Sequence, residues 1–418
     1  MPDVQWTAPV AHGLIDAHVS IPGSKSLTNR WLVLASLAST PTDIVGALAS
    51  RDSRLMIEAL GALGGSAATK DGALAISPLP FSLANPERDD SLEPLEIHCG
   101  LAGTVMRFVP PLALLTSRAV TFTGDGGALV RPMAALIDAL RQQGAEVTCH
   151  GEEGFLPFTV RGNGLPGGAV SIDASGSSQF VSALLLAAVR AQSPLTIRHT
   201  GAHLPSLPHI EMTLALLRKC GIEARHDVEN GCHEWSVTPG EPRLPDPVVV
   251  EPDLSNAGPF IAAALVTGGT VSIENWPEHT TQPGDEFRRI LPLMGAKVER
   301  IGPDVEFSGT GTLRGINVDL AAVGELTPTI AALAALANSP SRLSGIGHLR
   351  GHETDRVHAL AVELTKLGAS VSEGEDFLEI TPGPLTGTVF ETYEDHRMAT
   401  AGAIIGLRSE ERRVGEEC

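Results

Sequence analysis

The sequence predicts an α/β protein of two domains, each made of three copies of one structural repeat. The chain has 418 residues, which is more than a single hydrophobic core usually serves. Apolar residues make up 43% and aromatic residues only 4%, so the core must consist of small aliphatic side chains, as in layered α/β proteins. A short polar or glycine-containing cluster also leads six times into a helix of small apolar residues.

The six copies of this helix set the length of the repeat. Their starts are 77, 75, 78, 72 and 68 residues apart, and near-constant spacing over six copies indicates an internal repeat. The copies read SKSLTNRWLVLASLA from Ser24, LAGTVMRFVPPLALL from Leu101, GSSQFVSALLLAAV from Gly176, LSNAGPFIAAALV from Leu254, LTPTIAALAALA from Leu326 and EDHRMATAGAIIG from Glu394.

A second series of helices is amphipathic, and each of these ends in glycine. The glycine after the last periodic residue is the expected helix stop. The copies read RLMIEALGALGG, RPMAALIDALRQQGAEV, PHIEMTLALLRKCGIEA, GDEFRRILPLMGAKV and RVHALAVELTKLGASV. Strand-like segments lie between the helices, among them AVTFTG, GFLPFTV, VSIEN, INVDL and FLEITP. The repeat is therefore β-α-β-α-β-β, and three copies on each side place a domain boundary near residues 248–254.

Charge and cysteine content narrow the class of function. The net charge of −19 argues against nucleic acid or an acidic membrane surface as a partner, although a small anionic substrate stays compatible with it. The five cysteines are scattered without a CxxC pair, so we expect free thiols and no metal site. The N-terminus lacks targeting features and no apolar run is long enough to span a bilayer. We therefore expect a cytoplasmic enzyme.

Polar side chains gather where four of the small-residue helices begin. Backbone N–H groups and the helix dipole at such positions favour anions. The clusters are PGSKSLTNR with Lys25, Ser26 and Arg30, GLAGTVMR with Gly100 and Gly103, ASGSSQF with Ser177, Ser178 and Gln179, and YEDHR with Glu394, Asp395, His396 and Arg397. A fifth cluster, GHETDR, carries His352, Glu353, Asp355 and Arg356. Capped helices and surface salt bridges would also explain these clusters, but their convergence in one cleft would indicate a polyanionic substrate.

These motifs together resemble one enzyme family. PGSKSLTNR, LAGTVMRFVPP, RPMAALIDAL, SGSSQFVSALLLAA, HETDR and DHRMA follow the order and spacing of the 5-enolpyruvylshikimate-3-phosphate (EPSP) synthases, from about residue 14 to residue 407. The resemblance implies a two-domain inverse α/β barrel, the enolpyruvyl transferase fold, with substrates in the cleft between the lobes. It also implies a discontinuous first lobe, residues 1–23 and 249–418, with phosphoenolpyruvate-side residues and catalytic carboxylates. Residues 24–248 would form the second lobe, on the shikimate 3-phosphate side.

The resemblance implies transfer of the enolpyruvyl group of phosphoenolpyruvate to the 5-hydroxyl of shikimate 3-phosphate, by addition and elimination, on the shikimate pathway to chorismate and aromatic amino acids. The implied catalytic residues are Lys25, Glu325, Glu353 and His396. The residues implied to bind shikimate 3-phosphate are Lys25, Ser26, Arg30, Ser177, Ser178, Gln179, Ser206, Glu325 and His352. Those implied to bind phosphoenolpyruvate are Lys25, Gly103, Arg131, Gln179, Arg356 and Arg397. We expect a monomer without cofactor or metal, and inhibition by glyphosate.

The sequence departs from the family pattern in several places. Leu101, Phe108, His209 and His352 stand where many members have Asn, Pro, Tyr and Lys. These changes concern the phosphoenolpyruvate pocket and the response to inhibitors. Residues 408–418, RSEERRVGEEC, lack apolar periodicity and contain no counterpart of the family's lysine near the C-terminus. The sequence therefore predicts a truncation or a foreign join at this end.

Two alternative functions are compatible with parts of the same pattern. A UDP-N-acetylglucosamine enolpyruvyl transferase shares the fold, but that family has a cysteine on the loop before its RP helix, where this chain reads GDGGALVRPM. A binding or scaffold protein with the same fold and no catalysis is the second alternative. Phosphate release measured with each pair of substrates distinguishes the three.

Overall fold

The computed structural model describes residues 6–80, 89 and 91–408 and divides into two compact units. One unit, called here the discontinuous unit, consists of Met1–Ile21 and Pro252–Cys418. The other, called the continuous unit, consists of Pro22–Glu251. Each unit contains its own hydrophobic core, and small aliphatic side chains predominate in both. The chain passes from one unit to the other twice, after Ile21 and after Glu251.

The described residues form five four-stranded sheets, and all five share one strand order. In each sheet the first two strands are parallel, and the last two form an antiparallel hairpin whose second strand pairs with the second strand of the sheet. The orders are β13-β2-β4-β3, β5-β6-β8-β7 and β9-β10-β12-β11 in the continuous unit, and β1-β14-β16-β15 and β17-β18-β20-β19 in the discontinuous unit. This common order is the topology that a β-α-β-α-β-β repeat produces.

The five predicted segments AVTFTG, GFLPFTV, VSIEN, INVDL and FLEITP overlap β6, β8, β14, β17 and β20. In the continuous unit the strand bounds are β2 Thr42–Val45, β3 Ser66–Lys70, β4 Ala73–Ser77, β5 Leu95–His98, β6 Val120–Thr123, β7 Glu146–Cys149, β8 Phe158–Arg161, β9 Gly168–Ile172, β10 Leu195–His199, β11 Ala224–Glu229, β12 Cys232–Val237 and β13 Val248–Val249. In the discontinuous unit they are β1 Asp16–Val19, β14 Thr270–Ile273, β15 Lys297–Ile301, β16 Asp304–Ser308, β17 Asn317–Asp319, β18 Ser341–Ser344, β19 Ser370–Glu373 and β20 Phe377–Thr381.

The helices also match the two predicted series. The small-residue series gives α1 Lys25–Ser36, α3 Gly103–Phe108 continued by η1 Pro110–Leu115, α6 Gln179–Ala187 continued by η2 Ala188–Arg190, α8 Gly258–Thr267, η5 Gly324–Leu326 with α10 Thr327–Ala335, and α12 His396–Gly406. The amphipathic series gives α2 Arg51–Ala62, α5 Ala134–Gln142, α7 Leu207–Lys219, α9 Phe287–Ile290 between η3 Pro283–Glu286 and η4 Leu291–Met294, and α11 Arg356–Leu367. Short helices α4 Gly126–Leu129 and η6 Gly347–Gly351 complete the set.

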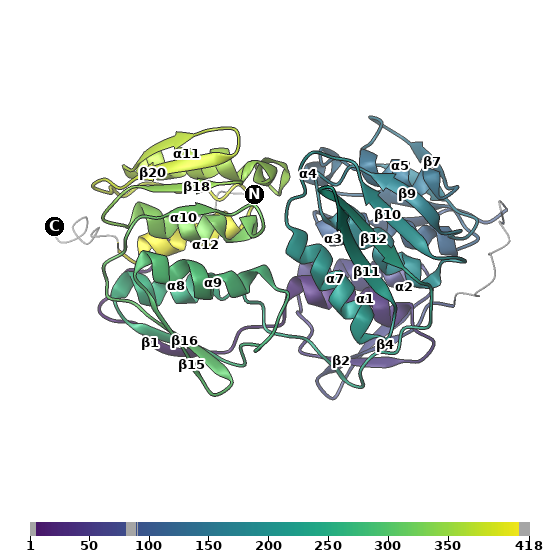
Figure 1. The fold of residues 1–418 in the computed structure, drawn as a ribbon, viewed down its shortest axis with the longest axis horizontal. Helices are drawn as coiled ribbons and strands as arrows, with labels where there is room; N and C mark the ends of the chain where they lie inside the picture. Colours follow the sequence, from purple (N-terminus) through teal and green to yellow (C-terminus); the bar gives the residue numbers. More distant parts are fainter. Residues whose placement is uncertain (1–5, 81–88, 90, 409–418) are drawn as a thin grey trace. The chain divides into compact units, whose positions relative to one another are not determined.

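The two helix series occupy different places because their surfaces differ. Helices α6 and α10 are buried on nearly every face, as expected for helices that are apolar all round. Figure 1 shows α8, α10 and α12 running together through the interior of the discontinuous unit, with strands on either side. Helices α5 and α11 instead bury one stripe and expose the other. The N-termini of the buried series are therefore fixed by rigid packing, which is what a binding site needs.

Two sheets take their first strand from a distant part of the sequence. Strand β1 pairs with β14, so that Asp16 lies opposite Thr270. Strand β13 pairs with β2, so that Val248 lies opposite Ile44. The sixth repeat contributes α12, and residues 382–395 before it contain no strand. The prediction about the C-terminal tail lies outside the described residues, which end at Arg408. None of the described helices is long and apolar enough to cross a membrane.

Candidate active site

Lys25 is the first residue of α1 and keeps about a third of its side chain exposed, 32%. Ser24 caps the helix by accepting a hydrogen bond from the Leu27 amide at 3.4 Å. The Lys25 ammonium group lies 3.3 Å from the carboxylate of Asp52, in the first turn of α2. This contact orients the lysine without burying it, so its charge stays accessible to an anionic ligand. Ser26, beside it, is half-buried.

Arg30 lies one turn further along α1 and is almost fully buried, at 1% exposure. Its guanidinium donates to the Thr213 hydroxyl at 2.7 Å and to the carbonyls of His209 and Ser26 at 2.9 and 3.0 Å. The charge also lies 5.2 Å from the ring centre of Phe108. Arg30 therefore ties α1 to α7 inside the continuous unit. Its expected contact with shikimate 3-phosphate stays a prediction.

Two arginines surround Gly103, the first residue of α3. Arg131 donates to the Leu101 carbonyl at 3.1 Å, and Arg107 donates to the side-chain oxygen of Gln179 at 3.1 Å. A Cβ atom on Gly103 would lie 2.9 Å from Nη1 of Arg107 and 3.1 Å from Nη2 of Arg131. The structure thus brings Gly103, Arg131 and Gln179 together as predicted. It adds Arg107, which the sequence reasoning missed although it stands one helical turn after Gly103 in the same motif.

Ser177 and Ser178 precede α6 and differ in exposure. The Ser177 hydroxyl accepts a hydrogen bond from the Gln179 amide at 3.3 Å, which stabilises the start of the helix. Ser178 is buried at 4%, whereas Ser177 is only partly covered. These serines therefore line the loop between β9 and α6, with Gln179 directed toward Arg107.

His199, at the end of β10, connects that loop to the next one. Its Nδ1 accepts from the Ala174 amide at 3.2 Å, so Nε2 carries the proton and donates to the His203 carbonyl at 3.1 Å. His199 is buried at 7%. The loop after His203 leads to Ser206, which has a left-handed backbone with φ of 53° immediately before α7. The two serine-bearing loops are thus held together by one histidine that the sequence reasoning did not single out.

Arg356, the first residue of α11, is the centre of a charged cluster in the discontinuous unit. It is buried at 2% and donates from Nε to Asp395 at 2.7 Å and from Nη2 to Glu353 at 2.8 Å. Its Nη1 lies 3.1 Å from Nδ1 of His352. Burial opposes the charge, but the carboxylates of Glu353 and Asp395 outweigh burial and raise the pKa of Arg356. The guanidinium is therefore fixed in orientation and permanently charged.

The remaining predicted residues of this unit join the same network through Asp395. Asp395 is buried at 1% and caps α12 by accepting from the Arg397 amide at 2.8 Å. The ring of His396 lies 3.9 Å from the same carboxylate. Arg397 donates to the Ser255 carbonyl at 3.4 Å, and the Ser255 hydroxyl donates to Glu325 at 2.5 Å. The cluster therefore connects two expected catalytic carboxylates, Glu325 and Glu353, with two expected phosphoenolpyruvate-binding arginines.

Asp395 was named from the sequence as part of the YEDHR cluster without being given a role, and Ser255 was not named. Asp395 carried a usable signal, because an aspartate directly before a helix that starts with His-Arg is a preferred N-cap. Ser255, in the segment LSNAG, carried none, because its role depends on a partner 70 residues away in sequence. Among the described residues, no group of three or more His, Cys, Asp or Glu side chains is placed to hold a metal ion.

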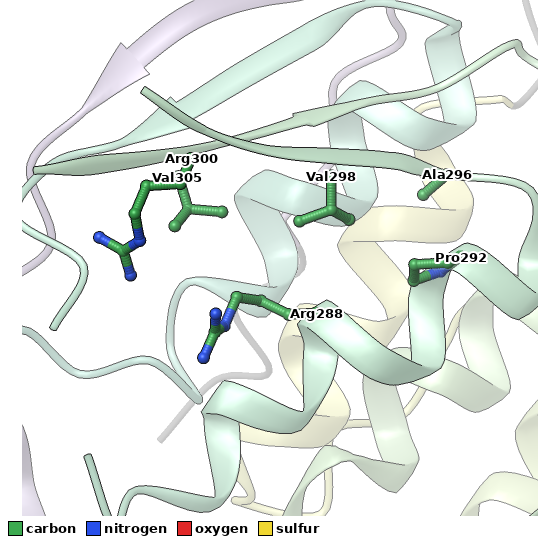
Figure 2. A pocket seen from close by; sticks show the side chains of 6 residues that line it. All are labelled: Arg288, Pro292, Ala296, Val298, Arg300 and Val305. Carbon is green, nitrogen blue, oxygen red and sulfur yellow. The ribbon is translucent and has the colours of Figure 1, made fainter. Parts of the chain in front are cut away.

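One hollow of about 390 Å³ lies elsewhere in the discontinuous unit, against the hairpin of β15 and β16. Figure 2 shows its lining residues, which are Arg288, Pro292, Ala296, Val298, Arg300 and Val305. Arg288 donates to Asp285 at 2.7 Å, and Arg300 donates to the Trp276 carbonyl at 3.0 Å. None of the predicted site residues lines this hollow.

The fold is that of the enolpyruvyl transferases. Two solved structures of EPSP synthase from Acinetobacter baumannii superpose with TM-scores of 0.74 and 0.73 at 24% identity. The matches cover 96% and 97% of this chain and 92% of each solved chain. The predicted two-domain α/β architecture is thereby confirmed.

Sequence comparison identifies the family. The family model described as EPSP synthase (3-phosphoshikimate 1-carboxyvinyltransferase) matches residues 11–416. A 3-phosphoshikimate 1-carboxyvinyltransferase of Kocuria rhizophila is 55% identical over 418 residues, covering 97% of this chain and 91% of the relative. The chain belongs to the EPSP synthase family, which confirms the predicted resemblance.

Proposed function

We propose that this chain transfers the enolpyruvyl group of phosphoenolpyruvate to the 5-hydroxyl of shikimate 3-phosphate and releases phosphate. The observation that carries this proposal is the 55% identity, over nearly the full chain, to the 3-phosphoshikimate 1-carboxyvinyltransferase of Kocuria rhizophila. The clustering of the predicted residues supports it, because both substrates are polyanions and the two clusters are rich in fixed cations. The family match favours this reaction over transfer to UDP-N-acetylglucosamine.

The chemistry of the site residues supports distinct roles for two kinds of group, guanidinium groups and serine hydroxyls. Arg131 beside Gly103 offers a planar guanidinium group, and so do Arg356 and Arg397, which both contact Asp395, the first through its side chain and the second through its backbone amide. Such groups pair well with phosphate and carboxylate. Serine hydroxyls before α6 and α7 are neutral donors, suited to a phosphate and to the hydroxyls of a ring. We assign these guanidinium groups to the binding of phosphoenolpyruvate. We assign the serine hydroxyls, together with Lys25 and Arg30, to the binding of shikimate 3-phosphate.

The proposed reaction is an addition followed by an elimination. The 5-hydroxyl oxygen attacks C2 of phosphoenolpyruvate, its proton passes to Glu325, and the methylene carbon gains a proton from Glu353. The resulting tetrahedral intermediate loses phosphate as the methyl group returns a proton to Glu353, which restores the double bond, and the proton held by Glu325 passes to the departing phosphate. Lys25 and His396 would stabilise the negative charge on the reacting groups. Fixed cations that need no reorganisation during the reaction are the most effective form of such stabilisation.

The test is phosphate release by the purified chain, with the organic product identified by mass spectrometry. Release should require both shikimate 3-phosphate and phosphoenolpyruvate and should proceed without added metal or nucleotide. Equal release with UDP-N-acetylglucosamine as acceptor would contradict the proposal. A folded chain that binds both substrates without turnover would favour the alternative of a binding protein.

We further propose that the chain works as a cytoplasmic monomer and that glyphosate competes with phosphoenolpyruvate.

A further inference from the structure

Glu363, on α11, is a carboxylate whose side chain is completely buried at 0% exposure. It accepts hydrogen bonds from the Tyr393 hydroxyl at 2.7 Å, from the Glu391 amide at 3.0 Å and from the Lys366 ammonium group at 2.7 Å. A buried charge is costly unless it is paired and hydrogen-bonded. Two of the three donors belong to the segment that leads into α12, so this carboxylate holds that segment against α11.

The segment held by Glu363 has an unusual backbone. Tyr393 and Glu394 are consecutive non-glycine residues with left-handed φ values of 53° and 56°. L-residues adopt this conformation singly and at a cost, and it persists only where surrounding contacts impose it. The next residue is Asp395, the N-cap of α12. The turn thus decides where the carboxylate of Asp395 points.

The same helix contacts this segment at a second point. Arg356 and Glu363 are seven residues apart on α11, so they lie on one face of the helix. Arg356 donates to Asp395 at 2.7 Å, and Glu363 accepts from Tyr393 at 2.7 Å. The strained turn lies between these two attachments. Removing the attachment at Glu363 would free the turn to relax and move Asp395 away from Arg356.

We propose that Glu363 is a positioning residue for the candidate active site, which it supports by imposing the turn at Tyr393 and Glu394 that directs Asp395 to Arg356. This inference rests on the proposed function, because it matters for catalysis only if Arg356 and Glu353 act on phosphoenolpyruvate. Glu363 contacts none of the predicted substrate-binding residues itself in the contacts described above. Its influence passes through Tyr393, the turn and Asp395.

The first test is spectroscopic and needs no activity. Tyr393 is the only tyrosine of the chain, so the absorbance of ionised tyrosine reports this residue alone. Partial desolvation, together with the hydrogen bond and charge of Glu363, raises the pKa of Tyr393 to about 12, although 39% of the residue is exposed. At pH 11 the folded wild type should keep Tyr393 largely protonated, whereas Glu363→Gln should show more phenolate. Equal absorbance in the two folded proteins, checked by circular dichroism, would show that Glu363 does not hold Tyr393.

The second test is kinetic and uses four variants: two single variants, the double variant and a control. Glu363→Gln and Tyr393→Phe should each raise the KM for phosphoenolpyruvate and lower kcat, with kcat/KM reduced about tenfold, on the order of 1.4 kcal/mol. The KM for shikimate 3-phosphate should stay within about twofold of wild type. Because both changes break the same attachment, the double variant should be little worse than either single variant. Lys366→Gln is the matched control: its side chain is 42% exposed, and the Tyr393 and Glu391 contacts remain, so wild-type kinetics are expected.

The outcomes separate the inference from the proposed function. Suppose that the wild type transfers the enolpyruvyl group, and that Glu363→Gln and Tyr393→Phe have the same kcat and the same KM for phosphoenolpyruvate as the wild type. The inference is then wrong. A fall in kcat alone, with both KM values unchanged, would indicate a smaller folded fraction and would also overturn it. Should Glu363→Gln fail to fold, Tyr393→Phe carries the same test. A wild type that fails to react contradicts the proposed function instead, while the absorbance of Tyr393 still tests the contact.

Discussion

Two arginines with nearly the same burial are held by different chemistry. Arg30 contacts a threonine hydroxyl and backbone carbonyls, whereas Arg356 contacts the carboxylates of Asp395 and Glu353. Neutral acceptors leave more of the positive charge available to an anion. Carboxylates neutralise part of it but fix the guanidinium more firmly, because charge-assisted hydrogen bonds are the stronger ones. The Arg356 cluster therefore depends on the completeness of its ion pairs.

We predict that Asp395→Asn lowers the free energy of unfolding by about 3 kcal/mol, because breaking a buried ion pair leaves a charge without full compensation. The asparagine keeps the size of the side chain and the ability to cap α12. Asp355→Asn is the control, since Asp355 also caps a helix and pairs with an arginine, Arg350, but its side chain is 38% exposed. Chemical denaturation should show a loss of less than about 1 kcal/mol for the control. Equal losses would show that burial does not distinguish the two pairs.

At Gly103 we predict that alanine raises the KM for phosphoenolpyruvate about tenfold, or roughly 1.4 kcal/mol. The added Cβ would lie 2.9 Å from Arg107 and 3.1 Å from Arg131, so one guanidinium must move. Gly126→Ala is the control, because a Cβ at that position meets no atom within 4 Å. Steady-state kinetics with each substrate varied checks this, and glyphosate inhibition should weaken in the same variant. A Gly103→Ala enzyme as sensitive as wild type would contradict the placement of the inhibitor at this loop.

At the scale of elements, the sequence predicts where most helices lie, but it predicts less well where a helix is interrupted. The expected helix over GDEFRRILPLMG is three short pieces, η3, α9 and η4. The break between α9 and η4 lies just before Pro292, which lacks the amide that a continuous helix would use. Similarly, α3 stops at Phe108 before two prolines and continues as η1. The positions of Lys25, Gly103 and Arg356 at helix starts could be read from local motifs. The contacts of Ser255 and His199 could not, because they depend on which loops the fold brings together.

The loops before α6 and α7 give a prediction at this scale. His199→Ala should raise the KM for shikimate 3-phosphate several-fold, on the order of 1 kcal/mol for a lost buried hydrogen bond, and leave the KM for phosphoenolpyruvate unchanged. His199→Asn keeps a polar atom near Nδ1 for the Ala174 amide, and His199→Gln keeps one near Nε2 for the His203 carbonyl. Each should restore part of the loss. An alanine variant with wild-type kinetics would show that Ser206 needs no support from this histidine.

At the scale of the whole molecule, each unit has its own core and its own natural reporter. The four cysteines among the described residues, Cys99, Cys149, Cys220 and Cys232, all lie in the continuous unit. Burial raises the pKa of Cys99 and of Cys220 to about 12, so their thiols react slowly at neutral pH while the unit is folded. Tyr393 lies in the discontinuous unit. Thiol labelling and tyrosine absorbance therefore report the two units separately.

We predict that core substitutions act within their own unit. Phe122→Ala and Phe307→Ala each remove a fully buried ring, one from each core, and each should cost about 3–5 kcal/mol. Under partial denaturation, Phe122→Ala should accelerate labelling of Cys99 and Cys220, as read by mass spectrometry. Phe307→Ala should lower the denaturant concentration at which the absorbance of Tyr393 changes. Its effect on the rate of cysteine labelling should be far smaller. Identical shifts of both reporters in both variants would show that the two cores unfold as one.

The pairing of β1 with β14 has a consequence for how the protein is made. On the ribosome, Asp16 emerges 254 residues before its partner Thr270, as the difference of their numbers shows. At typical synthesis rates the nascent strand waits roughly 13–50 seconds for that partner. The last strand of the continuous unit, β13 at Val248–Val249, is synthesised before β14. The continuous unit can therefore complete its folding first. Throughout this interval β1 is an unpaired edge, and its short sequence, DAHV with an aspartate and a histidine, is poorly suited to capture by neighbouring nascent chains.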